Sequence, residues 1–279
     1  MQQNINLFIQ NALAEDIGTG DITTLANIPK NNISEAICYV KEDCTIAGIE
    51  LALQICRKVD EELIVEFTCK DGDIVNSNTA IGNIKGSTHS ILKLERLLLN
   101  CMQRMSAIAT KTRHFVQLIA PYRVQLLDTR KTTPNFRVCE KWAVVIGGGV
   151  NHRIGLYDQI LIKDNHIKAA GDIQKAIEAC INYMEVHQVK VPVIVEVKNE
   201  TEFKIAESFP IVDRILLDNF EPVAIIDLLS NNITHKKLEA SGGINASNIV
   251  AYAKTGIHYV SLGDLTHHVS SIDISLKII

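Results

Sequence analysis

The sequence lacks the features that mark secreted, membrane-spanning and disordered proteins. Its seven cysteines are scattered, with no C-x-x-C pair, so we expect reduced and mostly buried thiols, as in a cytoplasmic protein. Its apolar runs fall well short of the ~18–20 residues of a membrane span. The N-terminus has neither the basic nor the apolar segment of a secretion signal. What remains is a globular composition, 47% hydrophobic and 22% charged, with no sign of a membrane partner.

Charge is distributed unevenly along the chain. The formal net charge is only −4, but residues 91–168 hold 13 Lys and Arg against 5 Asp and Glu, a net of +8. Residues 1–90 and 169–279 are acidic, with nets of −7 and −5. A basic middle between acidic flanks indicates that one region handles an anion. A nucleic-acid binder is not expected, because its positive charge would raise the pI of the whole domain, which is about 6.1 here.

The C-terminal part alternates short apolar runs with segments of helical spacing such as 172–187 and 221–231. This alternation predicts parallel strands joined by helical crossovers, and strands that are apolar along their length are buried on both faces. Polar residues end six of the runs: Thr129, Arg130 and Lys131; Lys163 and Asp164; Glu196 and Lys198; Asp218; Ser241; Gly263 and Asp264. Such strand ends meet at one mouth in a (β/α) barrel, which we favour over an open sheet.

The pattern of the N-terminal part predicts a separate, smaller α+β domain. A helix is expected to end near Gly18, and strands are expected at 36–50, 64–75 and 80–87, where Gly and Asp-Gly turns break the pattern. Apolar residues at 3–4 spacing predict one long helix over 90–120. We place the two domains at 1–105 and 106–279, with the last ~12 residues able to return to the first domain.

The strongest local motif is LLDTRKTTPNFR, residues 126–137. Arg130 and Lys131 directly follow a predicted buried strand, which delivers both charges to the mouth. Arg can clamp a planar carboxylate with two parallel hydrogen bonds, whereas Lys acts as a compact point charge. A helix is expected to start after Pro134. The alternative is an ordinary solvated loop.

A glycine-rich segment, residues 147–167, carries further cations. Three glycines allow close backbone approach, His152 and Arg153 follow them, and Lys163 ends the next predicted strand. Together these residues favour a binding site, although His152 alone has a structural alternative. His166 is ambiguous, because its hydrogen bond can serve only to hold the loop.

Two carboxylates, Glu196 and Asp218, end consecutive predicted strands. They would repel an anionic ligand unless a metal ion or sugar hydroxyls intervene, and Mg²⁺ prefers one or two carboxylates together with water and phosphate oxygens. A salt bridge to Lys163 or Lys198 is the alternative role for this pair.

Paired glycine turns follow the last two predicted strands, at 241–243 and 261–263. Their backbone N–H groups, with a helix expected from Asn245, predict a site for a sugar phosphate. The alternative is that these glycines serve only tight turns.

These blocks together resemble the quinolinate phosphoribosyltransferase family, the decarboxylating nicotinate-nucleotide pyrophosphorylases. The resemblance covers nearly the whole chain and is carried in order by ALAEDIGTGDIT, LERLLLN, DTRKTTPNFR, GGGVNHRIGLYDQILIKDNHI, VEVKN, LLDNF, EASGGIN and SLGDLTH. It implies an α/β fold, with an N-terminal α/β sandwich and an incomplete (β/α) barrel. It also implies a homodimer in which each N-terminal domain caps the partner's barrel.

The resemblance further implies roles for single residues. Arg96 would complete the partner's site, and Lys131, Glu196 and Asp218 would be catalytic, with the two carboxylates near ribose and Mg²⁺, which they hold directly or indirectly. The cationic pocket would comprise Thr129, Arg130, Lys131, His152, Arg153 and Lys163. The loops that bind the 5′-phosphate would comprise Ser241, Gly242, Gly243, Leu262, Gly263, Asp264 and His267. Asn135 and Asp264 depart from the family, which commonly has glycine and a neutral or basic residue there.

The implied reaction joins quinolinate and phosphoribosyl pyrophosphate, with Mg²⁺, into nicotinate mononucleotide, pyrophosphate and CO₂, a step of NAD biosynthesis. Three alternatives stay open. One is a related phosphoribosyltransferase acting on another ring acid. Another is a barrel lyase with Lys163 as a Schiff-base amine, which needs an uncharged lysine. The third is a phosphosugar-binding barrel without catalysis.

Overall fold

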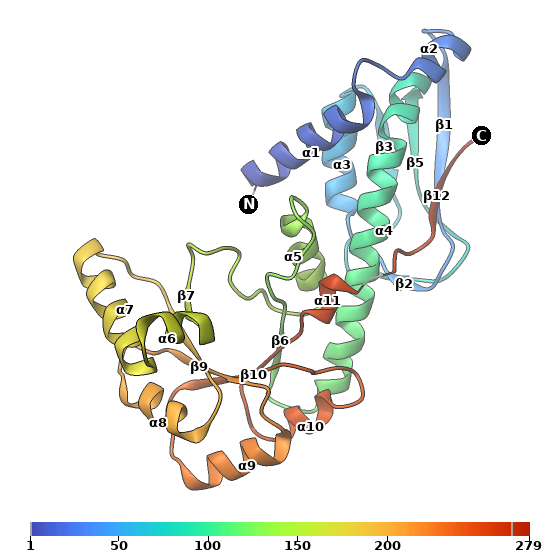
Figure 1. Cartoon of the computed structure of the whole chain (residues 1–279). Helices are drawn as coiled ribbons and strands as arrows, with labels where there is room; N and C mark the ends of the chain where they lie inside the picture. The colour runs from blue at the N-terminus through green and yellow to red at the C-terminus, as the bar shows by residue number, and fades with distance from the viewer. Residues whose placement is uncertain (1, 269) are drawn as a thin grey trace. The chain divides into compact units, whose positions relative to one another are not determined.

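In a computed structural model of the chain, which describes residues 2–268 and 270–279, the chain forms two compact units (Figure 1). Unit 1 comprises the residues up to His114 together with 131–148 and 265–279. Unit 2 comprises 115–130 and 149–264. Neither unit is therefore one continuous stretch of chain. None of the described helices is both long and apolar enough to cross a membrane.

Unit 1 is built on a four-stranded antiparallel sheet. Its order is β12-β1-β5-β3, with bounds β12 (Ile274–Ile278), β1 (Ile33–Val40), β5 (Thr79–Ser87) and β3 (Ile64–Phe67). Every second residue of the second half of β1 is buried, at Ala36, Cys38 and Val40, as expected for a strand with one face on the core. A smaller sheet pairs β2 (Cys44–Thr45) with β4 (Ile74–Val75). The last strand of the chain thus pairs with the first.

Five helices accompany this sheet: α1 (Gln2–Ile17), α2 (Ile22–Asn27), α3 (Ile49–Val59), α4 (Thr88–Ile119, in unit 1 up to His114) and α5 (Arg137–Ile146). The long helix predicted over 90–120 is confirmed as α4. The strand predicted over 36–50 is interrupted after Val40, resumes briefly as β2 and is wrong at its end, where α3 begins at Ile49. Gly48 adopts φ 99° before it, and the carboxylate of Asp71 accepts hydrogen bonds from the N–H groups of Ile49 and Glu50. This cap comes from a distant residue, so the local pattern could not indicate it.

Unit 2 is built on a six-stranded parallel sheet. Its order is β6-β11-β10-β9-β8-β7, with bounds β6 (Gln125–Leu127), β11 (Tyr259–Ser261), β10 (Lys237–Ser241), β9 (Arg214–Asp218), β8 (Val193–Val197) and β7 (Ile160–Ile162). A parallel bridge between Leu127 and Val150 continues the sheet beyond β6. Within the described residues, no ladder joins β7 back to β6. The predicted fold class, an α/β sandwich plus an incomplete barrel, is confirmed.

Helices connect the strands from β7 to β11: α6 (Asp164–Ala170), α7 (Ile173–His187), α8 (Glu200–Ser208), α9 (Pro222–Asn231) and α10 (Ile249–Ala253). After β11, α11 (Asp264–His267) leads into unit 1. Figure 1 shows α7, α8 and α9 along the outer side of the strands they connect. All five residues of β8 are buried, as expected for a strand covered on both faces. Leu161, Ile194 and Leu216 form a buried cluster on one face of three adjacent strands.

Candidate active site

The register of the parallel sheet brings the ends of its strands to one edge. Ser241 pairs with Asp218 and with Ser261, and Ser261 pairs with Leu127. Paired residues in a parallel sheet project to the same face. This edge therefore carries most of the predicted site residues of unit 2: Thr129, Arg130, Lys163, Glu196, Asp218, Ser241, Gly242, Gly243, Leu262, Gly263 and Asp264.

The segment that carries His152 and Arg153 is fixed to the strand next to it. The N–H of His152 donates to the buried carboxylate of Asp128 at 2.8 Å. Further along, the carboxylate of Asp158 accepts from the N–H groups of Ile154 and Gly155, at 2.7 and 3.0 Å. This loop is thus held by carboxylates that satisfy its backbone donors, which orders its cations before any ligand binds.

Arg130 and Arg153 lie close enough to influence one another. Arg153 is buried, with an exposed fraction of 7%. Burial, and after it the positive charge of Arg130, lower the pKa of Arg153, whereas Asp158 raises it. Two like charges held near each other favour the binding of an anion that attracts both.

The imidazole of His152 faces inward. Its Nδ1 accepts a hydrogen bond from the N–H of Arg153 at 2.7 Å, so the proton of the neutral ring belongs on Nε2. Nε2 lies 3.5 Å from a carboxylate oxygen of Glu239. The structural alternative for His152 is therefore present in the structure, because both ring nitrogens have protein partners.

Glu239 is a buried site residue that sequence reasoning missed. It is fully buried in the middle of β10 and accepts a hydrogen bond from Arg214 Nη1 at 2.9 Å. The guanidinium of Arg214 also lies 4.2 Å from the ring centroid of Tyr259. Burial raises the pKa of Glu239, but contacts with His152, Ser261 and Arg214 outweigh that effect and lower it. The missed signal was a charged residue inside an apolar strand pattern.

The two predicted carboxylates lie close enough to influence one another. Burial, and after it the charge of Glu196, raise the pKa of Asp218. Lys163 Nζ lies 2.8 Å from Glu196 Oε2, so the salt-bridge alternative is present for Glu196. Two neighbouring carboxylates are hard oxygen ligands of the kind that fit Mg²⁺.

His166 holds the start of α6. Its Nδ1 accepts from the N–H of Lys163 at 2.9 Å, which satisfies one of the donors at a helix N-terminus. Lys198 and Asp164 form a second ion pair across the neighbouring loops, at 3.3 Å. The ambiguity about His166 is thus resolved in favour of a loop-holding contact.

The glycine turn after β10 is tightly constrained on one side and open on the other. Gly242 adopts φ 99°, and a Cβ there would lie 2.1 Å from Asn219 Oδ1. Gly243 adopts φ 62°, and no atom lies within 4 Å of its Cβ position. The helix predicted from Asn245 begins instead at Ile249, because the Asn245 side chain accepts from the N–H of Ser247 and forms a turn.

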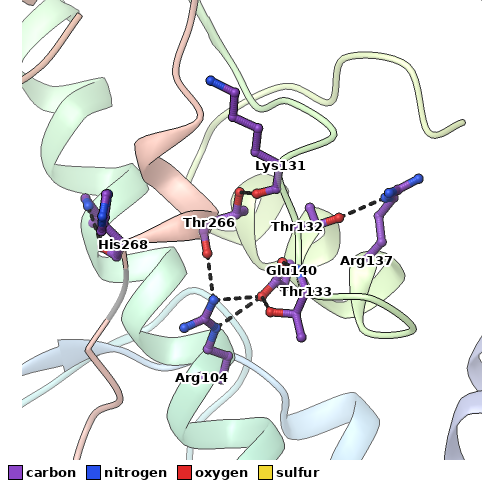
Figure 2. Close-up of polar contacts among 9 residues, drawn as sticks. Arg104, Lys131, Thr132, Thr133, Arg137, Glu140, Thr266 and His268 are labelled. Atoms are coloured by element: carbon purple, nitrogen blue, oxygen red, sulfur yellow. Dashed lines mark hydrogen bonds and ion pairs between the residues drawn. The ribbon is translucent and has the colours of Figure 1, made fainter. Parts of the chain in front are cut away.

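Three predicted site residues belong to unit 1. Arg96 lies on α4 and lines a hollow of about 530 Å³ between α1, α4 and the segment before α5, together with residues such as Phe8 and Phe136. His267 is exposed on α11, with its ring against that of His268. Lys131 is exposed in a loop whose three residues 131–133 are each held by another side chain (Figure 2).

The two departures from the family pattern have local explanations. Asn135 adopts φ 63°, a left-handed conformation that Asn tolerates better than most residues other than glycine. Asp264 is the first residue of α11, and an acidic side chain is favoured in the first turn of a helix. Neither departure therefore conflicts with the backbone at its position.

Comparison with known proteins gives consistent matches over both units. Residues 21–106 match the family model described as quinolinate phosphoribosyl transferase, N-terminal domain, and residues 108–277 match the C-terminal domain. The chain is 41% identical, over 97% of its length and 81% of the relative's, to quinolinate phosphoribosyltransferase [decarboxylating] 1b of Nicotiana tabacum. It is 39% identical to a probable nicotinate-nucleotide pyrophosphorylase [carboxylating] of Bacillus subtilis, over 95% of this chain and 90% of that one.

A solved structure extends the similarity to three dimensions. The nicotinate-nucleotide pyrophosphorylase from Francisella tularensis superposes with a TM-score of 0.89 at 37% identity, and the match covers 100% of this chain and 97% of that one.

Proposed function

Because the chain belongs to the quinolinate phosphoribosyltransferase family, we propose that it transfers a phosphoribosyl group from phosphoribosyl pyrophosphate to the ring nitrogen of quinolinate. The ring then loses CO₂. The products are nicotinate mononucleotide, pyrophosphate and CO₂, which places the enzyme, a pentosyltransferase, in NAD biosynthesis.

The observation that carries this proposal is the electrostatic pairing of Arg130 with Arg153. Burial, and after it the positive charge of Arg130, lower the pKa of Arg153, so the two guanidinium groups lie near enough for one ligand with two carboxylates to bind both. Each guanidinium can bind one carboxylate with two parallel hydrogen bonds. A monocarboxylate would leave part of this charge unbalanced, which favours quinolinate over nicotinate.

The chemistry needs charge stabilisation more than a strong base. As the bond between the anomeric carbon and pyrophosphate breaks, negative charge builds on the leaving group and positive charge on the ribose. We assign the first to Lys131 and the second to Glu196 or Asp218. The bond from the ring nitrogen to ribose makes that nitrogen cationic. This cation stabilises the electron pair left on the ring when the adjacent carboxylate leaves as CO₂, and a proton takes its place.

Mg²⁺ is the cofactor that this assignment includes. Glu196 and Asp218 would hold it, directly or through water, because two neighbouring carboxylates offer the hard oxygen ligands that this ion prefers. When bound, the ion neutralises phosphate charge. The 5′-phosphate is assigned to the backbone around Gly243 and Gly263, with His267.

Two further parts of the proposal concern the assembly and the cellular location. Arg96 completes the site of the partner subunit in a homodimer. We place the enzyme in the cytoplasm. Its seven cysteines are all free thiols, five of them buried, which is consistent with a reducing compartment.

The Schiff-base alternative is disfavoured by the environment of Lys163. Its ammonium lies 2.8 Å from Glu196, and this ion pair would have to break before the amine could attack a carbonyl.

The direct test is an assay of purified protein with quinolinate, phosphoribosyl pyrophosphate and Mg²⁺. We expect CO₂ and pyrophosphate in equal amounts, and loss of both when EDTA removes the metal. Nicotinate in place of quinolinate is the matched control. Pyrophosphate released with nicotinate but not with quinolinate would favour the related phosphoribosyltransferase instead.

A further inference from the structure

We propose that Glu140 and Thr266 are positioning residues that hold the Lys131 loop in one conformation, so that the Lys131 ammonium is in place before substrates bind. The inference rests on the proposed function, because that function assigns the departing pyrophosphate to Lys131. Neither residue belongs to the set that the sequence motifs assign to substrate.

Glu140 is the centre of the network. It is fully buried on α5, and its carboxylate receives four donors in Figure 2. Oε1 accepts from Arg104 Nε, Arg104 Nη2 and Thr133 Oγ1, at 3.1, 2.9 and 2.9 Å. Oε2 accepts from the N–H of Thr133 at 2.9 Å. The loop thus receives both a backbone and a side-chain contact from one buried carboxylate.

Thr266 connects this centre to Lys131 itself. Its hydroxyl donates to the carbonyl of Lys131 at 2.6 Å, and its own carbonyl accepts from Arg104 Nη2, also at 2.6 Å. Arg104 therefore bridges the buried carboxylate and the segment that carries His267. A third contact, from Arg137 Nε to the Thr132 hydroxyl at 2.8 Å, secures the remaining loop residue.

The direction of the Lys131 side chain relates this network to the proposed function. Its backbone is tied into the network, whereas the side chain extends away from Glu140 (Figure 2). The network therefore holds the backbone from which the lysine side chain extends. Preorganised charge is effective only where the reaction develops charge, so a fixed backbone at Lys131 favours a fixed position of its ammonium.

A purely structural role is the competing explanation, because breaking a buried ion pair such as Arg104–Glu140 also lowers the stability of the fold. Thr266→Val separates the two, since it removes one hydroxyl and leaves the ion pair intact. The matched control is Thr255→Val. Thr255 is also buried, and its hydroxyl donates to a backbone carbonyl, that of Tyr252, at 2.7 Å.

The readouts are steady-state kinetics, binding of each substrate and exchange of the Thr133 amide hydrogen in the absence of substrates. For Thr266→Val we expect about a tenfold loss in kcat/KM for phosphoribosyl pyrophosphate, the scale of one lost hydrogen bond. The quinolinate dissociation constant should stay as in the unchanged protein, and Thr133 should exchange several-fold faster. Thr255→Val should change stability alone.

Glu140→Gln is the second variant, and it is measured below its own melting temperature. It should produce the same kinetic change, and the double variant with Thr266→Val should lose less than the product of the two single losses, because both act through one loop. Unaltered exchange at Thr133 in Thr266→Val, or equal losses in Thr266→Val and Thr255→Val, would overturn the positioning role. Absence of product from the unchanged protein would instead refute the proposed function, since the exchange measurement needs no substrate.

Discussion

Single residues in unit 2 differ in how their charges are balanced. Arg130 lies near the like-charged Arg153, and Glu196 near the like-charged Asp218, and in each pair this charge adds to the larger effect of burial on the pKa of Arg153 or Asp218. The cluster around Glu239 is the opposite case, because its buried charge is paired with Arg214 and faces His152. Neighbouring groups of like charge are suited to binding charged ligands, whereas a buried cluster of opposite charges is suited to holding a strand and a loop together.

Arg130→Ala tests the assignment of the cationic pair. We expect quinolinate affinity to fall by about 30-fold or more, the scale of a lost charged hydrogen-bond pair, while the affinity for phosphoribosyl pyrophosphate is retained. Calorimetry with each substrate measures both. Arg123→Ala, at an exposed position nearby in the chain, is the control. Unchanged quinolinate affinity would show that Arg130 does not bind this substrate.

Glu239→Gln tests the balanced cluster. Removal of this buried charge leaves Arg214 without its carboxylate, so we expect the free energy of unfolding to fall by about 3 kcal/mol. Urea denaturation followed by circular dichroism measures the change. Glu61→Gln, at an exposed position, should have almost no effect. A Glu239→Gln variant as stable as the unchanged protein would mean that the ion pair contributes nothing net.

At the scale of helices and strands, several boundaries depend on contacts from elsewhere in the chain. The carboxylate of Asp71 caps α3 from a distant loop, so a helix begins at Ile49, where the end of a strand was expected. In unit 2, the connection from β10 through α10 to β11 is held at its end by His258. The N–H of Leu238 donates to His258 Nδ1 at 3.1 Å, and the N–H of His258 donates to the carbonyl of Leu238.

This contact makes the β10–β11 connection sensitive to acid. Burial, and after it the charge of Lys237, lower the pKa of His258 below its ordinary value of 6.5. The unfolded chain therefore binds this proton more tightly than the folded one. The contribution of His258 to stability is complete above pH 6.5 and is lost as the pH falls towards the lowered pKa.

His258→Asn should reduce this loss, because an amide oxygen can accept from Leu238 without titrating. Melting temperatures between pH 5 and pH 7.5 measure the slope, which should be shallower in the variant. His235→Asn, at an exposed position, should leave the slope as it is. Identical slopes in all three proteins would exclude His258 as the source.

At the scale of the whole molecule, the chain passes repeatedly between its two units. Lys131 and His267 lie in unit 1, whereas Arg130 and Gly263 lie in unit 2. Residues that are neighbours in one sequence motif thus belong to different structural units. The division into residues 1–105 and 106–279 stays a prediction about which segments fold together, and so does the homodimer.

Mixing two inactive variants tests the homodimer. If Arg96 acts in the partner's site, dimers formed from Arg96→Ala and Glu196→Gln subunits contain one intact site. Random exchange of subunits should then restore about a quarter of the full activity, since half of the dimers are mixed and each has one working site of two. Glu196→Gln mixed with Asp218→Asn is the control, and it should stay inactive because both changes fall in the same unit. No recovery in the first mixture would place Arg96 in its own subunit's site.

The sequence by itself determined the fold class, the family and which polar residues stand at the ends of the parallel strands. The alternation of apolar runs with helical segments is a local pattern, and residues that end parallel strands must meet at one edge whatever the details of packing. For the same reason Arg130, Lys163, Glu196, Asp218 and Ser241 could be singled out without coordinates.

Only the tertiary structure decided which polar groups satisfy one another. Asp71 caps a helix that starts 22 residues earlier in the chain, Glu140 meets Arg104 across 36 residues, and Glu239 meets Arg214 across 25. Each pair depends on the packing of separate elements, and buried polar groups must find partners wherever the fold places them. The spacing of residues in the sequence does not indicate such contacts. The partners of buried polar groups were therefore harder to predict than the residues at the ends of the parallel strands.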